Sequence, residues 1–273
     1  MKQSRSIART IASLLSDLLM RINRVKQALR QGKLQLGCGF AQLRSTEVAR
    51  LLAAAGFDWA FLDAEHGGFG QETLQDLCRA SVDAGLTPIV RVADLQYSLV
   101  ARALDNGAQG IIFPRVESPE LLERAVSWTK FPPLGVRGFG LTAVQVDYEK
   151  VTIPQIAAHM NEHVMVVLQI ETKLAVERRD ELLSVPGVDA VMVGPVDLSI
   201  SLGVAGDFQH PKMVEAMAQI RDSCVAHGVA PGTQTRTLAL AKFWKDRGML
   251  FVGCGSETGF LFEKASEVVA ALR

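Results

Sequence analysis

The sequence carries no excess of charge, because its 29 lysines and arginines are balanced by 29 aspartates and glutamates. A formal net charge of zero argues against nucleic acid or an anionic membrane as the main partner of the protein. Cysteines are few and scattered, since Cys38, Cys78, Cys224 and Cys254 form no C-x-x-C pair of the kind used for zinc or redox chemistry. We therefore expect reduced thiols and a cytoplasmic protein.

The sequence also lacks an apolar stretch that is long enough to span a membrane. Residues 1–22 combine basic residues with leucines and isoleucines at helical spacing, which predicts a basic amphipathic helix. A transit peptide or surface anchor has the same composition, but no small-residue cleavage site follows, and translation from Met20 would leave most of the segment out. We interpret residues 1–22 as an N-terminal helical extension and residues 23–273 as one domain.

From Leu36 onward, short apolar runs alternate with amphipathic segments, which is the pattern of repeated βα units around a parallel sheet. Eight such runs predict a closed (β/α)8 barrel, also called a TIM barrel. The expected strands are residues 36–41, 59–64, 88–92, 110–114, 164–170, 190–194, 229–233 and 250–254. Several predicted helices stop at a glycine, as expected for a left-handed residue after a helix: Gly56, Gly85, Gly107, Gly228 and Gly248.

Polar residues recur where the predicted strands end. In a parallel barrel the carboxyl ends of all strands meet at one rim, so these residues are expected around a single pocket. Gln169 and Glu171 are two residues apart and share the strand face opposite Ile170. Glu171 and Asp197 follow adjacent strands with no histidine or cysteine beside them, which favours a hard oxygen site for Mg²⁺ or Mn²⁺ over structural zinc. The alternative is that Asp197 caps a helix and Glu171 forms a salt bridge.

His66 and Arg91 are the other candidates at strand ends. His66 closes an Asp63-Ala-Glu65-His66 run, whose two carboxylates can orient the imidazole and raise its basicity. An inward Arg91 needs an anion, which a substrate carboxylate supplies, whereas an outward Arg91 belongs to a solvated face.

A long glycine-rich loop interrupts the regular pattern at residues 131–148. Loops of this length in compact domains are usually functional or disordered, and we expect this one on the same rim. Within it, Arg137 either meets a substrate carboxylate or braces the loop.

Several separate strings resemble the HpcH/HpaI family of metal-dependent aldolases, from about Asn23 to the C-terminus. They are Ala55-Gly-Phe-Asp-Trp-Ala-Phe-Leu-Asp-Ala-Glu-His66, Val90-Arg91, Ala103-Leu-Asp105-Asn-Gly-Ala-Gln-Gly, Pro132-Pro-Leu-Gly-Val-Arg-Gly, Gln169-Ile-Glu171-Thr and Gly194-Pro-Val-Asp197-Leu-Ser. The resemblance implies a (β/α)8 barrel that assembles as a homo-oligomer, a hexamer. It also implies reversible cleavage of a 4-hydroxy-2-oxo acid into pyruvate and an aldehyde through a metal-stabilised enolate.

The same resemblance assigns roles to individual residues. Glu171 and Asp197 would hold the divalent cation, Mg²⁺, Mn²⁺ or Co²⁺. Pyruvate would be bound by Arg91, Gln169, Asp197 and the backbone at Val196. His66 would be the proton acceptor. Asp105, in a predicted helix, would pair with the histidine of a neighbouring subunit.

Two departures from the family pattern leave the natural aldehyde open. The loop after Arg137-Gly138 lacks a further arginine, so a second substrate carboxylate is not expected to be recognised there. Thr233-Gln-Thr-Arg236 stands where an aliphatic residue is common. Three other functions remain as alternatives: a Schiff-base aldolase using Lys173, an acyl-CoA lyase of the same superfamily, and a non-catalytic barrel that binds an oxo acid.

Overall fold

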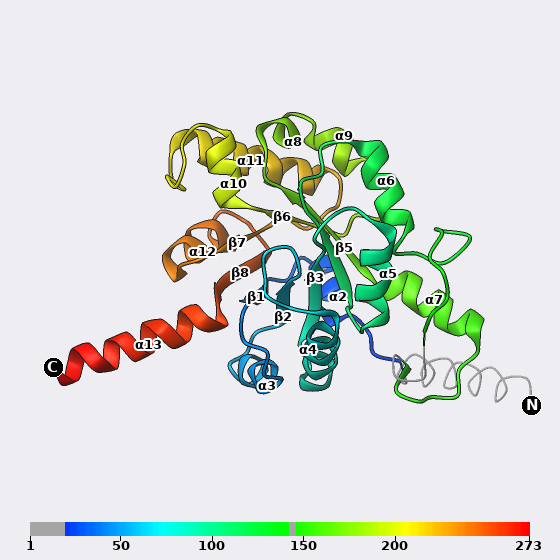
Figure 1. The fold of residues 1–273 in the computed structure, drawn as a ribbon. Coiled ribbons are helices and arrows are strands. Elements are labelled where there is room, and N and C mark those ends of the chain that lie inside the picture. Colours follow the sequence, from blue (N-terminus) through cyan, green and yellow to red (C-terminus); the bar gives the residue numbers. More distant parts are fainter. Residues whose placement is uncertain (1–19, 142–145) are drawn as a thin grey trace, which may run out of the picture.

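Eight parallel strands, paired in sequential order, close into a barrel in the computed structural model, which describes residues 20–141 and 146–273 (Figure 1). The strands are β1 Gln35–Phe40, β2 Trp59–Asp63, β3 Thr87–Arg91, β4 Gly110–Phe113, β5 Met165–Ile170, β6 Ala190–Val193, β7 Gly232–Thr235 and β8 Phe251–Ser256. The predicted (β/α)8 barrel is therefore confirmed. The predicted N-terminal helix falls mainly on residues 1–19, outside the described residues, so the boundary at residue 22 stays a prediction.

One or more helices follow each strand and return the chain to the amino-terminal end of the barrel. The helices are α2 Arg24–Arg30, α3 Glu47–Ala54, α4 Gln71–Ala84, α5 Tyr97–Asp105, α6 Pro119–Ser127, α7 Ile153–His163, α8 Lys173–Glu177, α9 Arg179–Leu183, α10 Pro195–Ser201, α11 Pro211–Ala226, α12 Leu238–Lys245 and α13 Glu257–Leu272. The glycines predicted at the ends of helices all have positive φ angles, between 69° and 103°. This agrees with the left-handed conformation expected at those positions.

The position of β7 differs from the prediction. The expected strand covered residues 229–233, whereas β7 begins at Gly232 and ends at Thr235. Before Gly232 there is only an isolated bridge between Ala190 and Ala230. Pro231 explains the shift, because proline has no N–H to donate to a ladder of hydrogen bonds.

The barrel interior is filled by side chains that alternate with outward-facing ones along each strand. Trp59 stacks on Phe251 across the interior, with ring centroids 4.0 Å apart. A Cβ atom at Gly37 would come within 2.1 Å of the Trp59 ring, so only glycine fits there. Val25 and Leu29 of α2 belong to the same buried cluster and help to close the amino-terminal end. The polar side chains that line a cavity lie at the opposite, carboxyl-terminal end of the barrel.

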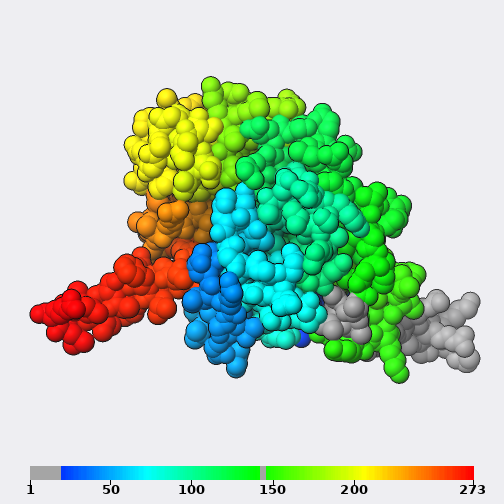
Figure 2. All heavy atoms as spheres, in the orientation of Figure 1, coloured from blue at the N-terminus to red at the C-terminus, as the bar shows by residue number. Residues whose placement is uncertain are grey.

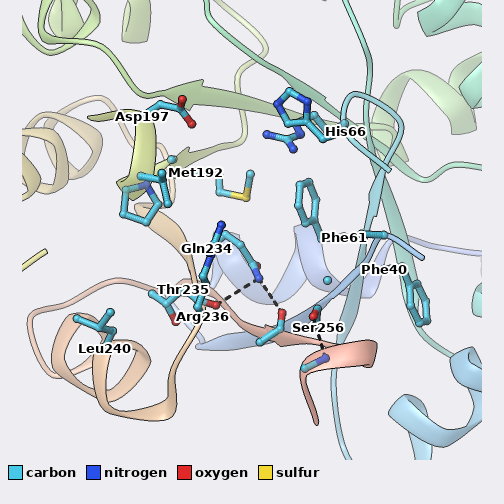
Figure 3. A pocket seen from close by; sticks show the side chains of 18 of the residues that line it. Phe40, Phe61, His66, Met192, Asp197, Gln234, Thr235, Arg236, Leu240 and Ser256 are labelled. Atoms are coloured by element: carbon cyan, nitrogen blue, oxygen red, sulfur yellow. Dashed lines mark hydrogen bonds between the residues drawn. The ribbon is translucent and has the colours of Figure 1, made fainter. Parts of the chain in front are cut away.

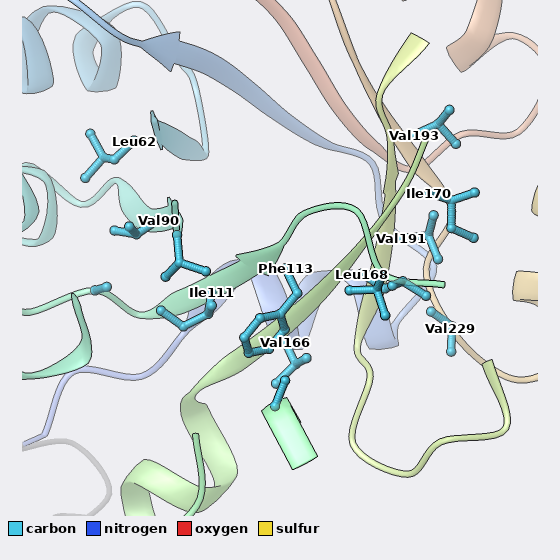
Figure 4. Packing of buried hydrophobic residues seen from close by; sticks show 14 of the residues in the cluster. Leu62, Val90, Ile111, Phe113, Val166, Leu168, Ile170, Val191, Val193 and Val229 are labelled. Atoms are coloured by element: carbon cyan, nitrogen blue, oxygen red, sulfur yellow. The ribbon is translucent and has the colours of Figure 1, made fainter. Parts of the chain in front are cut away.

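The outward faces of the strands pack against the surrounding helices in a larger apolar cluster. Figure 4 shows part of it on β2 to β6, including Leu62, Val90, Leu168 and Val191. This layer fixes each strand from outside, so the residues at the strand ends are held in place by the core.

Helix α13 departs from this arrangement, because it projects away from the barrel as an arm (Figures 1 and 2). Every residue from 261 to 273 is exposed. Among the described residues, no helix has the length and apolar character needed to cross a membrane.

Candidate active site

A cavity of about 640 Å³ lies at the carboxyl ends of the strands. Its wall includes five of the predicted site residues: His66, Arg91, Gln169, Val196 and Asp197. They come from the carboxyl ends of β2, β3, β5 and β6 or from the residues that follow, so the barrel rim brings together residues that are far apart in the chain. Figure 3 shows His66 and Asp197 at this cavity. Phe61 and Met192 form part of the apolar wall.

Arg91 points inward, with 12% of its side chain exposed, and it is already paired with acids of the protein. Its Nε and Nη2 donate to Asp63 Oδ1 and Oδ2 at 3.0 and 2.7 Å, and Nε lies 3.3 Å from Glu65 Oε2. The negative charge that Arg91 was expected to receive from a substrate is therefore already supplied by Asp63 and Glu65. Among the described residues, the remaining nitrogen Nη1 has no hydrogen-bond partner, and Arg91 lines the cavity.

Asp63 holds the backbone of Glu65 and His66 in place. It does not orient the His66 imidazole, which is what the sequence suggested. Burial alone would raise the pKa of the Asp63 carboxyl, but the hydrogen bonds and charge of Arg91, with two backbone N–H groups, lower it overall. Those N–H groups belong to Glu65 and His66, and both donate to Oδ1 at 3.1 Å. Only Glu65 approaches the ring, with Oε1 3.8 Å from His66 Nε2.

Arg115 is a site residue that the sequence did not reveal. Its φ angle of 52° is uncommon for a residue other than glycine and is the kind of strain that concentrates at functional sites. Its backbone N–H donates to Glu171 Oε1 at 2.8 Å, and its Nη2 lies 2.9 Å from Glu65 Oε1. Arg115 follows Phe113-Pro at the end of β4, so the strand-end position was the available signal.

Gln169 lies in β5 and Glu171 directly follows the end of the strand, with the two side chains on the same side of the chain. Ile170 packs in the outer cluster as predicted. The Gln169 amide donates to Glu171 Oε2. Burial raises the pKa of the Glu171 carboxyl, and the negative charge of Asp197 raises it further, against the hydrogen bonds from Gln169 and Arg115. Glu171 is buried behind the cavity wall, and no ion pair to it is found among the described residues.

Asp197 lies in the first turn of α10, next to Val196. Gly194 occupies the N-cap position and no side chain caps the helix, so Asp197 does not serve as the cap. In a first turn the backbone N–H groups have no acceptor within the helix. Both the Asp197 carboxylate and the N–H of Val196 are therefore available to a ligand in the cavity.

The residues present fit a divalent cation with hard oxygen ligands. Gln169 Oε1 is buried and finds no hydrogen-bond partner in the described part of the chain, and a cation would relieve the repulsion between Glu171 and Asp197. A Cβ atom at residue 194 would come within 2.7 Å of Glu171 Oε2, so Gly194 keeps this space open. Across residues 20–141 and 146–273, three or more histidine, cysteine or acidic side chains nowhere lie close enough together to hold a metal. The protein would thus supply two acidic ligands, Glu171 and Asp197, and leave the other coordination positions of the cation open.

Asp105 and Arg137 lie away from this cavity, at the amino-terminal end of the barrel. Asp105 is the last residue of α5, just before β4, and Arg137 Nη2 donates to its Oδ1 at 2.8 Å. The Arg137 side chain is 1% exposed and its guanidinium lies 4.8 Å from the Phe131 ring centre. Arg137 therefore braces the loop. The described part of residues 131–148 does not lie on the catalytic rim where it was expected, and residues 142–145 are outside the description.

A (β/α)8 barrel with polar side chains gathered around one cavity at its carboxyl rim has the layout of barrel enzymes. A sequence model described as HpcH/HpaI aldolase/citrate lyase matches residues 35–263. Over 253 residues, 91% of this chain and 94% of the relative, the chain is 36% identical to a 4-hydroxy-2-oxo-heptane-1,7-dioate aldolase of Escherichia coli.

Comparison with solved structures points to the same family. The fold is similar to that of an HpcH/HpaI aldolase from Desulfitobacterium hafniense, with a TM-score of 0.86, 31% identity and coverage of 90% and 95% of the two chains. A family protein from Burkholderia cenocepacia gives a TM-score of 0.85, 31% identity and coverage of 92% and 99%. The chain belongs to the HpcH/HpaI aldolase/citrate lyase family, and it is a carbon–carbon lyase, an aldolase.

Proposed function

We propose that the protein is a divalent-metal-dependent aldolase that reversibly cleaves a 4-hydroxy-2-oxo acid into pyruvate and an aldehyde. The observation that carries this proposal is the meeting of His66, Arg91 and Asp197 around one cavity, with Glu171 buried directly behind its wall. The substrate in the name of the Escherichia coli relative, a 4-hydroxy-2-oxo diacid, supports the substrate class.

Pyruvate is assigned to the side of the cavity formed by β3, β5 and β6. Arg91 contributes the Nη1 group that its acidic partners leave unused, and Gln169 contributes its amide. The N–H of Val196 faces no helical acceptor and suits a carboxylate oxygen. A divalent cation (Mg²⁺, Mn²⁺ or Co²⁺) held by Glu171 and Asp197 would act as a Lewis acid and stabilise the negative charge of the pyruvate enolate.

His66 is assigned the proton transfer. Its side chain is 69% exposed, at the open side of the cavity, and lies beside Glu65. His66 takes the proton of the substrate 4-hydroxyl, and the C3–C4 bond breaks. The bonding electron pair stays with C3 as the enolate, and C4 becomes the carbonyl carbon of the aldehyde. Addition of a proton to C3 then completes pyruvate, and the reverse order of events forms the new bond.

A homo-oligomer, a hexamer by family resemblance, completes this proposal. In one chain, Asp105 ends α5 at the amino-terminal end of the barrel, whereas His66 follows β2 at the carboxyl end. The two side chains cannot meet within a subunit, so the proposed pairing of Asp105 with a histidine requires a neighbouring copy. The exposed arm α13 supports association, because an apolar helix face is rarely left in water.

Release of pyruvate, followed with lactate dehydrogenase, tests the proposal. EDTA should abolish cleavage of a 4-hydroxy-2-oxo acid, and Mg²⁺, Mn²⁺ or Co²⁺ should restore it. Glu171→Gln and Asp197→Asn should abolish metal-dependent release, since each removes one of the two acids. Glu177→Gln, an exposed acid on α8, is the matched control and should retain activity. Full activity of Asp197→Asn would contradict the metal assignment.

The same assay distinguishes the proposed metal-dependent mechanism from a Schiff-base mechanism. Borohydride inactivation in the presence of pyruvate would indicate a Schiff base on lysine. Lys173 is the candidate from the sequence, but it begins α8, is 65% exposed and lies 3.6 Å from Glu177. Such an exposed, ion-paired lysine does not lie in the hydrophobic pocket that activates a Schiff-base lysine, so we expect borohydride to have no effect.

A further inference from the structure

The side of the cavity opposite the proposed pyruvate site has its own character. It is formed by residues that follow β7 and β8 and by neighbouring helices (Figure 3). Leu240 and Phe260 make this part of the wall apolar, while Arg236 and Glu263 place one charge of each sign beside it. The cavity volume of about 640 Å³ is in the range of sites for ligands much larger than pyruvate.

Arg236 is held at this wall by the local fold. It is the first residue after β7, and the next residue, Thr237, caps α12 by accepting the N–H of Leu240 at 3.4 Å. Thr235, the last residue of β7, anchors the other side, because its hydroxyl donates to the carbonyl of Gly253 at 3.1 Å. The backbone of Arg236 is therefore fixed from both sides, and its side chain starts at the cavity.

Among the residues that the structure describes, the guanidinium of Arg236 has no acidic partner, unlike the other arginines near the functional residues. Arg91, Arg115 and Arg137 are each paired with a carboxylate of the protein. Within the described part of the chain, Arg236 forms no ion pair or hydrogen bond, and Glu263 does not reach it. A guanidinium presents five N–H donors in a planar fork that matches an oxyanion. Its unused donors are consequently available to a ligand in the cavity.

We propose that Arg236 is a specificity-determining residue that selects aldehyde partners carrying an oxyanion at the end remote from the carbonyl. This inference rests on the proposed function, which places pyruvate on the β3, β5 and β6 side and thereby directs the aldehyde toward β7 and β8. The apolar side chains between the two ends would contact the methylene groups of such an aldehyde.

Matched aldehydes test this assignment in the direction of synthesis with pyruvate and Mg²⁺. Succinic semialdehyde is compared with butanal, and glyceraldehyde 3-phosphate with glyceraldehyde, so that a carboxylate and a phosphate are tested separately. The wild-type protein should prefer a charged member in kcat/KM by about 10- to 100-fold, as expected for charge-assisted hydrogen bonds. Arg236→Gln should reduce this ratio to about 3-fold or less, mainly through KM, and Arg236→Lys should keep part of it. Arg50→Gln, an exposed arginine on α3, should leave the ratio unchanged.

A binding measurement separates failure of this inference from failure of the proposed function. Neither 2-oxoadipate nor 2-oxohexanoate has a 4-hydroxyl to react, and only the first carries a distal carboxylate. Calorimetry with Mg²⁺ present should show tighter binding of 2-oxoadipate, with the difference lost in Arg236→Gln. Equal use of the charged and neutral probes by the wild type, or an unchanged ratio in Arg236→Gln, overturns the role of Arg236 alone. No turnover and no binding of any probe overturns the proposed function together with it.

Discussion

Two lysines, Lys26 and Lys130, are buried at the amino-terminal end of the barrel, and Lys130 makes the stability of the fold depend on pH. Lys130 Nζ donates to the carbonyls of Asn161 and Val164 at 2.8 and 3.0 Å. Lys26 donates to the same Val164 carbonyl at 3.0 Å and lies 3.1 Å from Asp189. Burial, with the nearby charge of Lys26, lowers the pKa of Lys130 to about 8, against the attraction of acids such as Asp189.

We predict that titration of Lys130 increases the free energy of unfolding as pH rises from about 8 to 10.5. In this range an unfolded chain, with an ordinary lysine pKa of 10.5, binds a proton that the folded chain does not. The free energy of unfolding should therefore increase by up to about 1.4 kcal/mol per pH unit from this group. Urea unfolding of wild type and Lys130→Met measures the contribution as a difference. Lys33→Met, an exposed lysine, controls for loss of charge. A difference that does not change across this range would contradict the prediction.

At the scale of elements, the loop after α6 packs against the end of α5. Arg137 is buried between Phe131 and Asp105, and burial lowers the pKa of its guanidinium although Asp105 opposes the effect. Its Nε and Nη1 are buried and have no partner within the described residues, where the ion pair with Asp105 is its main polar contact. Gly138 adds a second contact by donating to the Tyr97 hydroxyl at 2.8 Å. This loop therefore fixes the position of the Asp105 carboxylate.

We predict that Arg137→Met lowers the free energy of unfolding by about 1 to 3 kcal/mol, because a hydrogen bond to a charged group is lost while most of the packing is kept. Chemical denaturation measures the loss. Arg124→Met removes an exposed arginine that also stacks on an aromatic ring, Trp128, and should have little effect. If the two variants are equally destabilised, the ion pair with Asp105 is not the cause. Combination with Asp105→Asn should add little to the effect of Arg137→Met.

At the scale of the whole molecule, the arm α13 carries an apolar face that its own barrel does not cover. Leu261 and Phe262 are 63% and 74% exposed, and Val268, Val269 and Leu272 lie on the same side of the helix. In the other βα units the helix after the strand packs on the outside of the barrel. A second copy that receives this arm would bury the apolar face, which agrees with the proposed homo-oligomer.

We predict that Leu261→Glu together with Val268→Glu shifts the protein to a smaller oligomer. Burial of such a side chain contributes about 1.5 to 3 kcal/mol, so each change should weaken association by at least about 10-fold. Light scattering after gel filtration measures the mass, and Lys264→Ala on the same helix is the control. An unchanged mass would show that α13 is not part of the interface. If the proposed Asp105–His66 contact also crosses subunits, mixed oligomers of His66→Ala and Asp105→Asn should regain activity that neither variant has alone.

The sequence by itself determined the barrel and most of the rim. Short apolar runs between amphipathic segments specify the strands, and the glycines after the helices specify where those helices end. Because Gln169 and Glu171 are two residues apart at the end of β5, the position of their side chains on one side of the chain follows from local geometry. The convergence of His66, Arg91 and Asp197 follows from the parallel arrangement of the strands.

The tertiary structure decided which charges meet. Asp63 pairs with Arg91 across 28 residues, Arg137 with Asp105 across 32, and the Arg115 N–H reaches Glu171 across 56. No local pattern encodes these separations, since they depend on how the strands and loops pack side by side. For the same reason only the fold placed Arg137 away from the catalytic rim, and Arg236 on the wall of the cavity with no acidic partner among the described residues.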